Sequence, residues 1–290
     1  MSAYRITTDS TVDLSPARLR ELDVQYVALH FLLEGQDIAD DMTEQTAKML
    51  YNSMREGKVS TTSQATVESF IDLWTPILEK GEDVLYIGFS SALSGTVNSS
   101  VLARQQLLEK YPERTILIID SLCASSGEGM LLEHAVTLKQ NGMGLDELYR
   151  EIENKKMTVH HWFTVDDLVY LRRGGRVSGA AALFASLLSI KPVMNTNSEG
   201  KLIPREKIKG RRGAIKRLYE LLVEKIDQKA TTFINISHAD CYEDALQLKQ
   251  LIQEGYPDLP VNIYSVGAVI GSHSGPGTLA LFFMGAPRTV

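Results

Sequence analysis

A unit of apolar strand, polar turn and amphipathic helix recurs in the first half of the chain, and this recurrence limits the available folds most strongly. Residues 83–89 form a continuous apolar run typical of a buried strand, 90–96 is a polar turn, and helical spacing follows to about residue 110. The run 115–119 ends in a second polar turn before another helical pattern. This alternation is typical of a parallel sheet whose strands are joined by helices.

The second half mixes strand and helix patterns without that regular order. Residues 157–163 have the composition of a strand, and the charge character changes soon afterwards. We therefore predict two α/β domains, an N-terminal domain with a parallel sheet at 1–155 and a C-terminal domain with a mixed sheet at 156–290. The other expected strands are 4–8, 24–33, 190–195, 202–205, 232–236, 261–264 and 278–283, and the other expected helices are 43–56, 67–78, 211–226 and 242–254.

The composition indicates a water-soluble protein with a large core. The chain has 290 residues, of which 44% are hydrophobic and 23% charged, and no apolar run approaches the roughly 18 residues that a membrane span needs. The start lacks the apolar segment of a secretion signal. Cys123 and Cys241 lie far apart, outside any C-x-x-C pair, so we expect reduced thiols and a cytoplasmic location.

Positive charge is concentrated in one segment although the whole chain has a net charge of −6. Residues 171–217 carry a net charge of +10, which leaves −16 for the remainder. The asymmetry indicates either a local anion site or acidic partner surface, or a solvated basic face. Nucleic acid is not expected, because Phe184 is the only aromatic residue within the basic segment.

Three clusters of small hydroxyl residues, 61–64, 90–96 and 271–278, lie at expected element boundaries. Hydroxyls beside the free N–H groups of a helix N-terminus can bind a carboxylate or phosphate, but they can equally serve as helix caps. Ser94 is placed to open the helix that follows it. We expect His273 in a loop bent by Gly275 and Gly277, where its imidazole can donate to an anion or make a structural hydrogen bond.

Other familiar chemistries find no support in the sequence. There is no zinc or calcium pattern, so we predict no metal and no cofactor, and neither nucleotide-binding glycine motif occurs. Residues 88–92 lack the last glycine of a G-x-S-x-G hydrolase motif. The uncharged run 178–188 predicts a helix capped by Ser178, which is either core or the wall of a hydrophobic pocket beside the arginines.

Seven short motifs follow one another along the chain: Thr8-Asp9-Ser10, Thr62-Ser63-Gln64, residues 91–96, Asp120-Ser121, residues 172–176, Lys191-Pro192 and residues 267–277. In this order they resemble the DegV family, which includes the fatty-acid-binding subunits of bacterial fatty acid kinase. The resemblance covers essentially the whole chain. Two prolines of the family pattern are replaced here, by Ala65 and Ala268, and neither position supplies a side-chain hydrogen bond, so the head-group contact of the family should be kept.

The resemblance implies a long-chain fatty acid in an apolar tunnel between the two domains. It assigns the carboxylate contact to Thr62, Ser94 and His273, with Ser63 and Gly95 beside them. The protein would be a carrier, not catalytic alone, that presents the carboxylate to an ATP-dependent fatty acid kinase for acyl phosphate formation in phospholipid metabolism. The basic residues that would serve the kinase and phosphate are Arg172, Arg173, Arg176 and Arg205.

Two alternatives stay open from the sequence. Ser94 and His273 supply the residue types of an ester or thioester hydrolase, although the sequence assigns no acid to them. The chain could also be a lipid-sensing regulatory module, and transient contact with a membrane surface is compatible with either lipid role. Chain-length preference and oligomeric state depend on packing that the sequence does not specify.

Overall fold

The N-terminal part of the chain forms a four-stranded parallel sheet, sheet A, in the computed structural model, which describes residues 3–177 and 189–289. The parallel sheet confirms the expectation from the strand–helix alternation. The expected helix at 178–188 lies outside the described residues. In spatial order the strands are β2 (Gln25–Val27), β1 (Tyr4–Asp9), β6 (Asp83–Gly88) and β7 (Ile116–Asp120).

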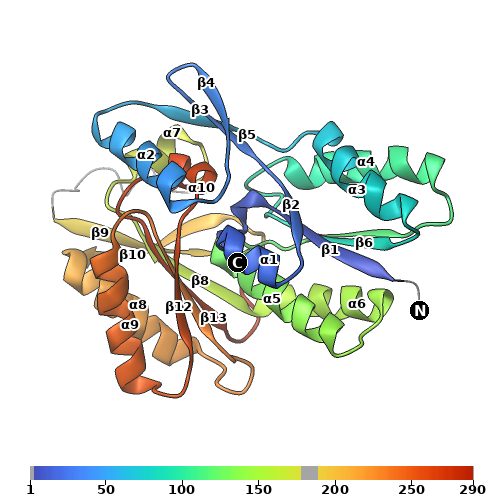
Figure 1. The fold of residues 1–290 in the computed structure, drawn as a ribbon. Coiled ribbons are helices and arrows are strands. Elements are labelled where there is room, and N and C mark those ends of the chain that lie inside the picture. Colours follow the sequence, from blue (N-terminus) through green and yellow to red (C-terminus); the bar gives the residue numbers. More distant parts are fainter. Residues whose placement is uncertain (1–2, 178–188, 290) are drawn as a thin grey trace.

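Helices cover both faces of sheet A (Figure 1). Alternate residues of β6 explain this arrangement, because Val84 and Tyr86 pack on one face while Leu85 and Ile87 pack on the other. The covering helices are α3 (Val67–Glu79) and α4 (Thr96–Lys110) on the first face, and α5 (Ser126–Gln140) and α6 (Leu145–Lys155) on the second. Shorter elements are α1 (Pro16–Glu21) and the 3-10 turns η1 (Ser10–Val12) and η2 (Lys156–Thr158).

The C-terminal part forms a six-stranded mixed sheet, sheet C, as expected. Helices α8 (Arg211–Lys225) and α9 (Tyr242–Gly255) cover one face, and α5 packs on the other. Only the pair β11–β12 is parallel among the described strands of this sheet. The order is β10 (Leu202–Lys209), β9 (Ile190–Thr196), β8 (Val159–Thr164), β13 (Leu279–Met284), β11 (Ile234–His238) and β12 (Val261–Ser265).

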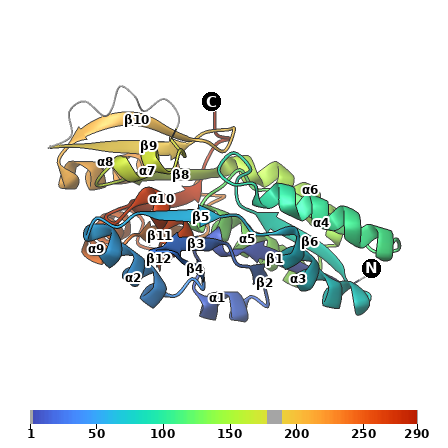
Figure 2. The ribbon, with the colours of Figure 1, turned by 90° about the horizontal axis from the view of Figure 1, so that it is seen from above.

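A third, small antiparallel sheet, sheet B, joins the two parts. It packs with α2 (Glu44–Arg55) against α10 (Ala268–Ser274), which also contacts α7 (Val169–Arg173). Figure 2 shows α10 running beside β5. The strands of sheet B are β4 (Gln36–Ala39), β3 (His30–Leu33) and β5 (Ser60–Ser63).

Two expectations about local structure are wrong. The single strand expected at 24–33 is divided between β2 in sheet A and β3 in sheet B, because the chain leaves one sheet for the other. His273 lies in the last turn of α10 and not in a loop, since the glycine-rich bend begins only at Gly275, where φ is +79°. The chain enters sheet C directly after η2, beside the expected domain boundary at 155/156. Sheet B, from the N-terminal segment, nevertheless packs on α10, from the C-terminal segment. The division into two domains at this boundary therefore stays a prediction.

Candidate functional site

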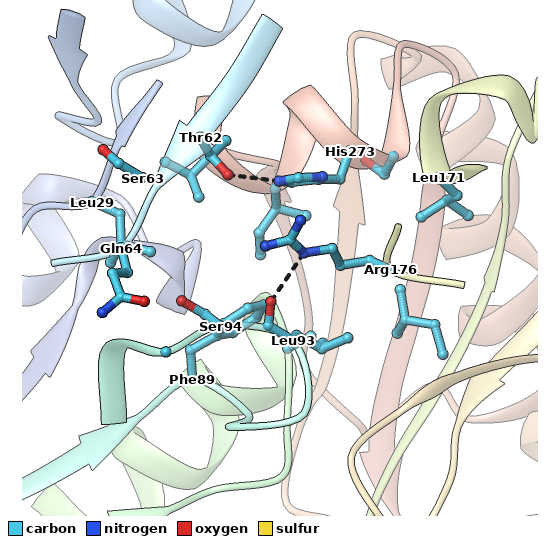
Figure 3. A pocket seen from close by; sticks show the side chains of 16 residues that line it. Leu29, Thr62, Ser63, Gln64, Phe89, Leu93, Ser94, Leu171, Arg176 and His273 are labelled. Atoms are coloured by element: carbon cyan, nitrogen blue, oxygen red, sulfur yellow. Dashed lines mark hydrogen bonds between the residues drawn. The ribbon is translucent and has the colours of Figure 1, made fainter. Parts of the chain in front are cut away.

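A cavity of about 340 Å³ lies where β5, the β6–α4 loop, α7 and α10 meet (Figure 3). Its lining is more apolar than polar, and we call the part where Thr62, Arg176 and His273 lie together its polar end (Figure 3). The polar lining residues are Thr62, Ser63, Gln64, Ser94, Arg176, His273 and Ser274. The larger apolar ones are Leu29, Phe89, Leu93, Leu171, Leu202, Val269 and Ile270.

Thr62 and His273 meet at the polar end of the cavity. The Oγ1 atom of Thr62 is 2.7 Å from Nε2 of His273, so the structure brings these two expected site residues together (Figure 3). Burial, and secondarily the positive charge of Arg176, lowers the pKa of His273 to about 4. At neutral pH the imidazole is therefore uncharged, with one N–H donor and one acceptor nitrogen. Its Nδ1 has no hydrogen-bond partner among the described residues.

Ser94 and Gly95 lie on the cavity wall just before α4. The Ser94 hydroxyl is 2.9 Å from Oγ1 of Thr96 and accepts a hydrogen bond from the Thr96 N–H at 3.3 Å, so Ser94 helps cap α4 as well as lining the cavity. A Cβ on Gly95 would lie 2.0 Å from Oε1 of Gln64. Glycine at this position therefore lets Gln64 cross the wall and donate to Ser99. Ser63 lies beside them on exposed β5.

The expected group of arginines is divided. Arg176 lines the cavity and donates to the carbonyls of Leu93 at 3.1 Å and Gly174 at 2.5 Å. Arg173 and Lys58 line a second cavity of about 150 Å³ that shares Thr62, Arg176 and His273 with the first. The two cavities therefore meet at the polar end.

The other two arginines lie elsewhere. Arg172 is exposed on α7. Arg205 bonds to Asn195 and lines a separate cavity of about 480 Å³, together with His160 and Lys225. The structure thus places Arg173 and Arg176, but not Arg205, beside His273.

A small apolar chamber of about 60 Å³ continues from the inner end of the main cavity. The two share Ala124, Leu171, Leu202, Ile270 and Ser274. Sheet C closes the chamber with side chains that include Phe163, Ala280 and Phe282. The sequence analysis missed these residues, because an apolar residue that lines a cavity has the same pattern as one that fills a core.

The chain is similar to known proteins over nearly its whole length. The sequence profile of a family described as uncharacterised proteins of the DegV family matches residues 3–286. The chain belongs to the DegV family. A DegV domain-containing protein of Clostridium perfringens is 42% identical over 98% of both chains.

Solved structures of DegV proteins share the whole fold. A fatty-acid-binding DegV family protein from Thermus thermophilus is 30% identical, with a TM-score of 0.86 over 98% of this chain and 99% of its own. DegV of Bacillus subtilis, a fatty acid binding protein, is 29% identical, with a TM-score of 0.85 over 98% of this chain and all of its own.

The geometry of this DegV chain gives the hydrolase alternative no support. A serine hydrolase needs its serine bonded to the histidine and an acid bonded to the other ring nitrogen. Here Nε2 of His273 contacts Thr62, Ser94 contacts Thr96, and no carboxylate contacts Nδ1 of His273 within residues 3–177 and 189–289.

Residues 3–177 and 189–289 contain no helix with the length and apolar character required to cross a bilayer. They also contain no cluster of three or more His, Cys, Asp or Glu side chains arranged to bind a metal ion.

Proposed function

We propose that this protein binds a long-chain fatty acid, with the alkyl chain in the cavity and inner chamber and the carboxylate at Thr62, Ser94 and His273. The observation that carries the proposal is the joining of an apolar cavity to a polar end where a threonine hydroxyl meets a half-buried, neutral histidine. Two solved relatives with the same fold are fatty-acid-binding proteins by description, which supports the same ligand class.

The two ends of such a ligand contribute differently to affinity. Each methylene removed from water contributes about 0.8 kcal/mol, so most of the binding free energy comes from the chain. A buried carboxylate without donors would cost several kcal/mol, and the hydroxyls of Thr62 and Ser94 offset that cost. In this arrangement the Nε2–H of His273 donates to Oγ1 of Thr62, which leaves the Thr62 hydroxyl proton for the ligand. The polar end therefore fixes the orientation of the ligand.

Mass spectrometry of the purified protein tests this proposal. Denaturation should release fatty acid in about equimolar amount, and delipidated protein should take up hexadecanoate. The absence of both a released lipid and uptake would refute it.

We further propose that the protein is a cytoplasmic carrier that presents the carboxylate to an ATP-dependent fatty acid kinase. Arg173 supports this role, because its exposed guanidinium supplies positive charge beside the carboxylate end, where an acyl phosphate would develop negative charge. Lys58 lines the same cavity, but its charge is balanced by ion pairs with Glu34 and Glu56. The carrier has no catalytic role alone in this scheme. A lipid-sensing module is the remaining alternative, and lipid-dependent binding to a protein other than a kinase would favour it.

The structure changes which arginine best tests the kinase proposal. The basic cluster alone suggests Arg176→Ala, but Arg176 holds the Leu93 and Gly174 carbonyls and lines the lipid cavity. Exposed Arg173 is the cleaner choice. Arg173→Ala should retain hexadecanoate and lose acyl phosphate formation with the kinase, whereas Arg205→Ala, at a different cavity, should retain both. Full activity of Arg173→Ala would remove that residue from the kinase contact.

A further inference from the structure

Two buried carboxyl groups hold the first turn of the helix that carries His273. The Oδ1 atom of Asp13 accepts a hydrogen bond from the Gly267 N–H at 2.9 Å, and Oδ2 of Asp40 accepts one from the Val269 N–H at 2.9 Å. A Cβ on Gly267 would lie 2.9 Å from the Asp13 oxygen and 3.0 Å from the Asp40 oxygen. Glycine is therefore needed for α10 to start between them.

The two aspartates come from segments far from α10 in the chain. Asp13 directly follows η1, which follows the inner strand β1 of sheet A, and has a left-handed φ of +49°. Asp40 directly follows β4 of sheet B. The second oxygen of Asp13 accepts a hydrogen bond from the Ser125 hydroxyl, and the second oxygen of Asp40 accepts one from the Met42 N–H. The α10 N-terminus is thus joined to sheet A, sheet B and α5 at once.

Burying these two carboxyl groups costs free energy of folding. Asp13 and Asp40 are 2% and 1% exposed, and neither forms an ion pair within the described parts of the chain. Burial raises the pKa of Asp40 to about 6 and that of Asp13 well above its usual range. The titratable groups that face the pair are acidic or phenolic, namely Asp9, Asp41, Glu128, Tyr26 and Tyr51. Apolar residues here would leave the N–H groups of Gly267, Val269 and Met42 without acceptors, so the carboxyls are needed to fix the start of α10.

The position of α10 directly determines the position of His273. The helix has seven residues, from Ala268 to Ser274, with His273 in its last turn. A displacement of its first turn is therefore transmitted to the imidazole, whose contact with Thr62 is a single hydrogen bond of 2.7 Å. Within the described residues, the only other side-chain hydrogen bond between β5 and α10 joins the hydroxyls of Ser60 and Ser272, 2.8 Å apart.

We propose that Asp13 and Asp40 are positioning residues, which fix α10 and so hold His273 at the carboxylate end of the cavity. This role rests on the fatty-acid function proposed above. The carboxyls contact no ligand in this scheme. They act through the backbone N–H groups of Gly267 and Val269.

Asp40→Asn tests the proposal. The Met42 and Val269 N–H groups each bond to one oxygen of Asp40, whereas asparagine of the same shape has only one acceptor oxygen, so one of the two N–H groups loses its partner. Asp41→Asn is the matched control, since it changes the same charge one residue along, at an exposed position bonded to Thr43. Two quantities are measured on delipidated protein: the Kd for hexadecanoate at pH 7.5, and the pKa of His273 by NMR titration, with the signal assigned through His273→Asn.

The proposal predicts that Asp40→Asn raises Kd at least fivefold and moves the His273 pKa upward from about 4, because the displaced imidazole becomes hydrated. Asp41→Asn should change neither quantity. If Asp40→Asn does not fold, Gly267→Ala provides the same perturbation from the other side, since its Cβ would displace both carboxyls.

Unchanged Kd and unchanged His273 pKa in Asp40→Asn or Gly267→Ala would overturn the proposal. A fall in affinity with an unchanged His273 pKa would also overturn it, because the aspartates would then be merely structural. The NMR titration needs no ligand. If wild-type protein failed to bind hexadecanoate, the titration would still decide whether the aspartates position His273.

Discussion

Replacing Thr62 with valine removes one hydroxyl and keeps the shape of the side chain. In the structure that hydroxyl is 2.7 Å from Nε2 of His273 at the polar end of the cavity. Under the proposed function it also donates to the ligand carboxylate. A hydrogen bond to a charged group contributes roughly 1.5–3 kcal/mol, and each 1.4 kcal/mol changes Kd tenfold. We therefore expect Thr62→Val to raise Kd for hexadecanoate by roughly 10- to 100-fold.

The assay is calorimetric titration of delipidated protein at pH 7.5, and it includes hexadecanol as a second ligand. The alcohol has the same chain but no charge, so the Thr62→Val effect should fall to a few-fold with it. Thr61→Val is the matched control, because Thr61 neighbours Thr62 on β5 but does not line the main cavity. A change below twofold for hexadecanoate, or equal losses for acid and alcohol, would refute the placement of the carboxylate at Thr62.

Three further predictions concern Gly174, His273 and Asp40. Gly174→Ala should raise Kd for hexadecanoate about tenfold by calorimetry, because its Cβ would lie 2.0 Å from Nδ1 of His273; unchanged affinity would argue against imidazole contact. Hexadecanoate binding at pH 6 should take up protons, since the carboxylate raises the pKa of His273 from about 4; calorimetry in two buffers of different ionisation enthalpy measures the uptake, which His273→Asn should abolish. Burial raises the pKa of Asp40 from 3.8 to about 6, so the folded state holds this proton more tightly than the unfolded state, and the resulting stability, present below pH 4, is lost as pH rises through 6. The loss amounts to about 3 kcal/mol, and urea unfolding between pH 4 and 7 should show a smaller loss in Asp40→Asn than in the wild type.

The sequence was most informative where local patterns and the final structure coincide. The apolar run before Ser90 and the helical spacing after Thr96 predicted β6 and α4 closely, since both elements take their character from side chains they bury. The same alternation placed the 90–96 turn at the carboxyl end of a parallel strand, where ligand sites of such sheets form. Ser94 and Gly95 line the cavity there.

Long-range packing explains what the sequence could not specify. Sheet B brings Thr62 onto α10, more than two hundred residues away, through contacts that leave no periodic signal at either end. His273 was expected in a loop because the glycines that follow it outweighed the short helical stretch before it. Arg205 was grouped with Arg173 by charge and sequence proximity, yet β10 carries it to another cavity.

A neutral pair such as Thr62 and His273 suits a carrier better than a fixed cation would. An arginine paired bidentately with the carboxylate would bind it more strongly and would also reduce the electron density on its oxygens. The uncharged imidazole and hydroxyl offset the cost of burial while leaving the carboxylate able to attack a phosphorus atom. Arg176 lies nearby, but its Nε and one terminal nitrogen donate to backbone carbonyls. Under the proposed function, affinity then depends on the alkyl chain and reactivity on the polar end, so separate substitutions would change ligand length and transfer to the proposed kinase.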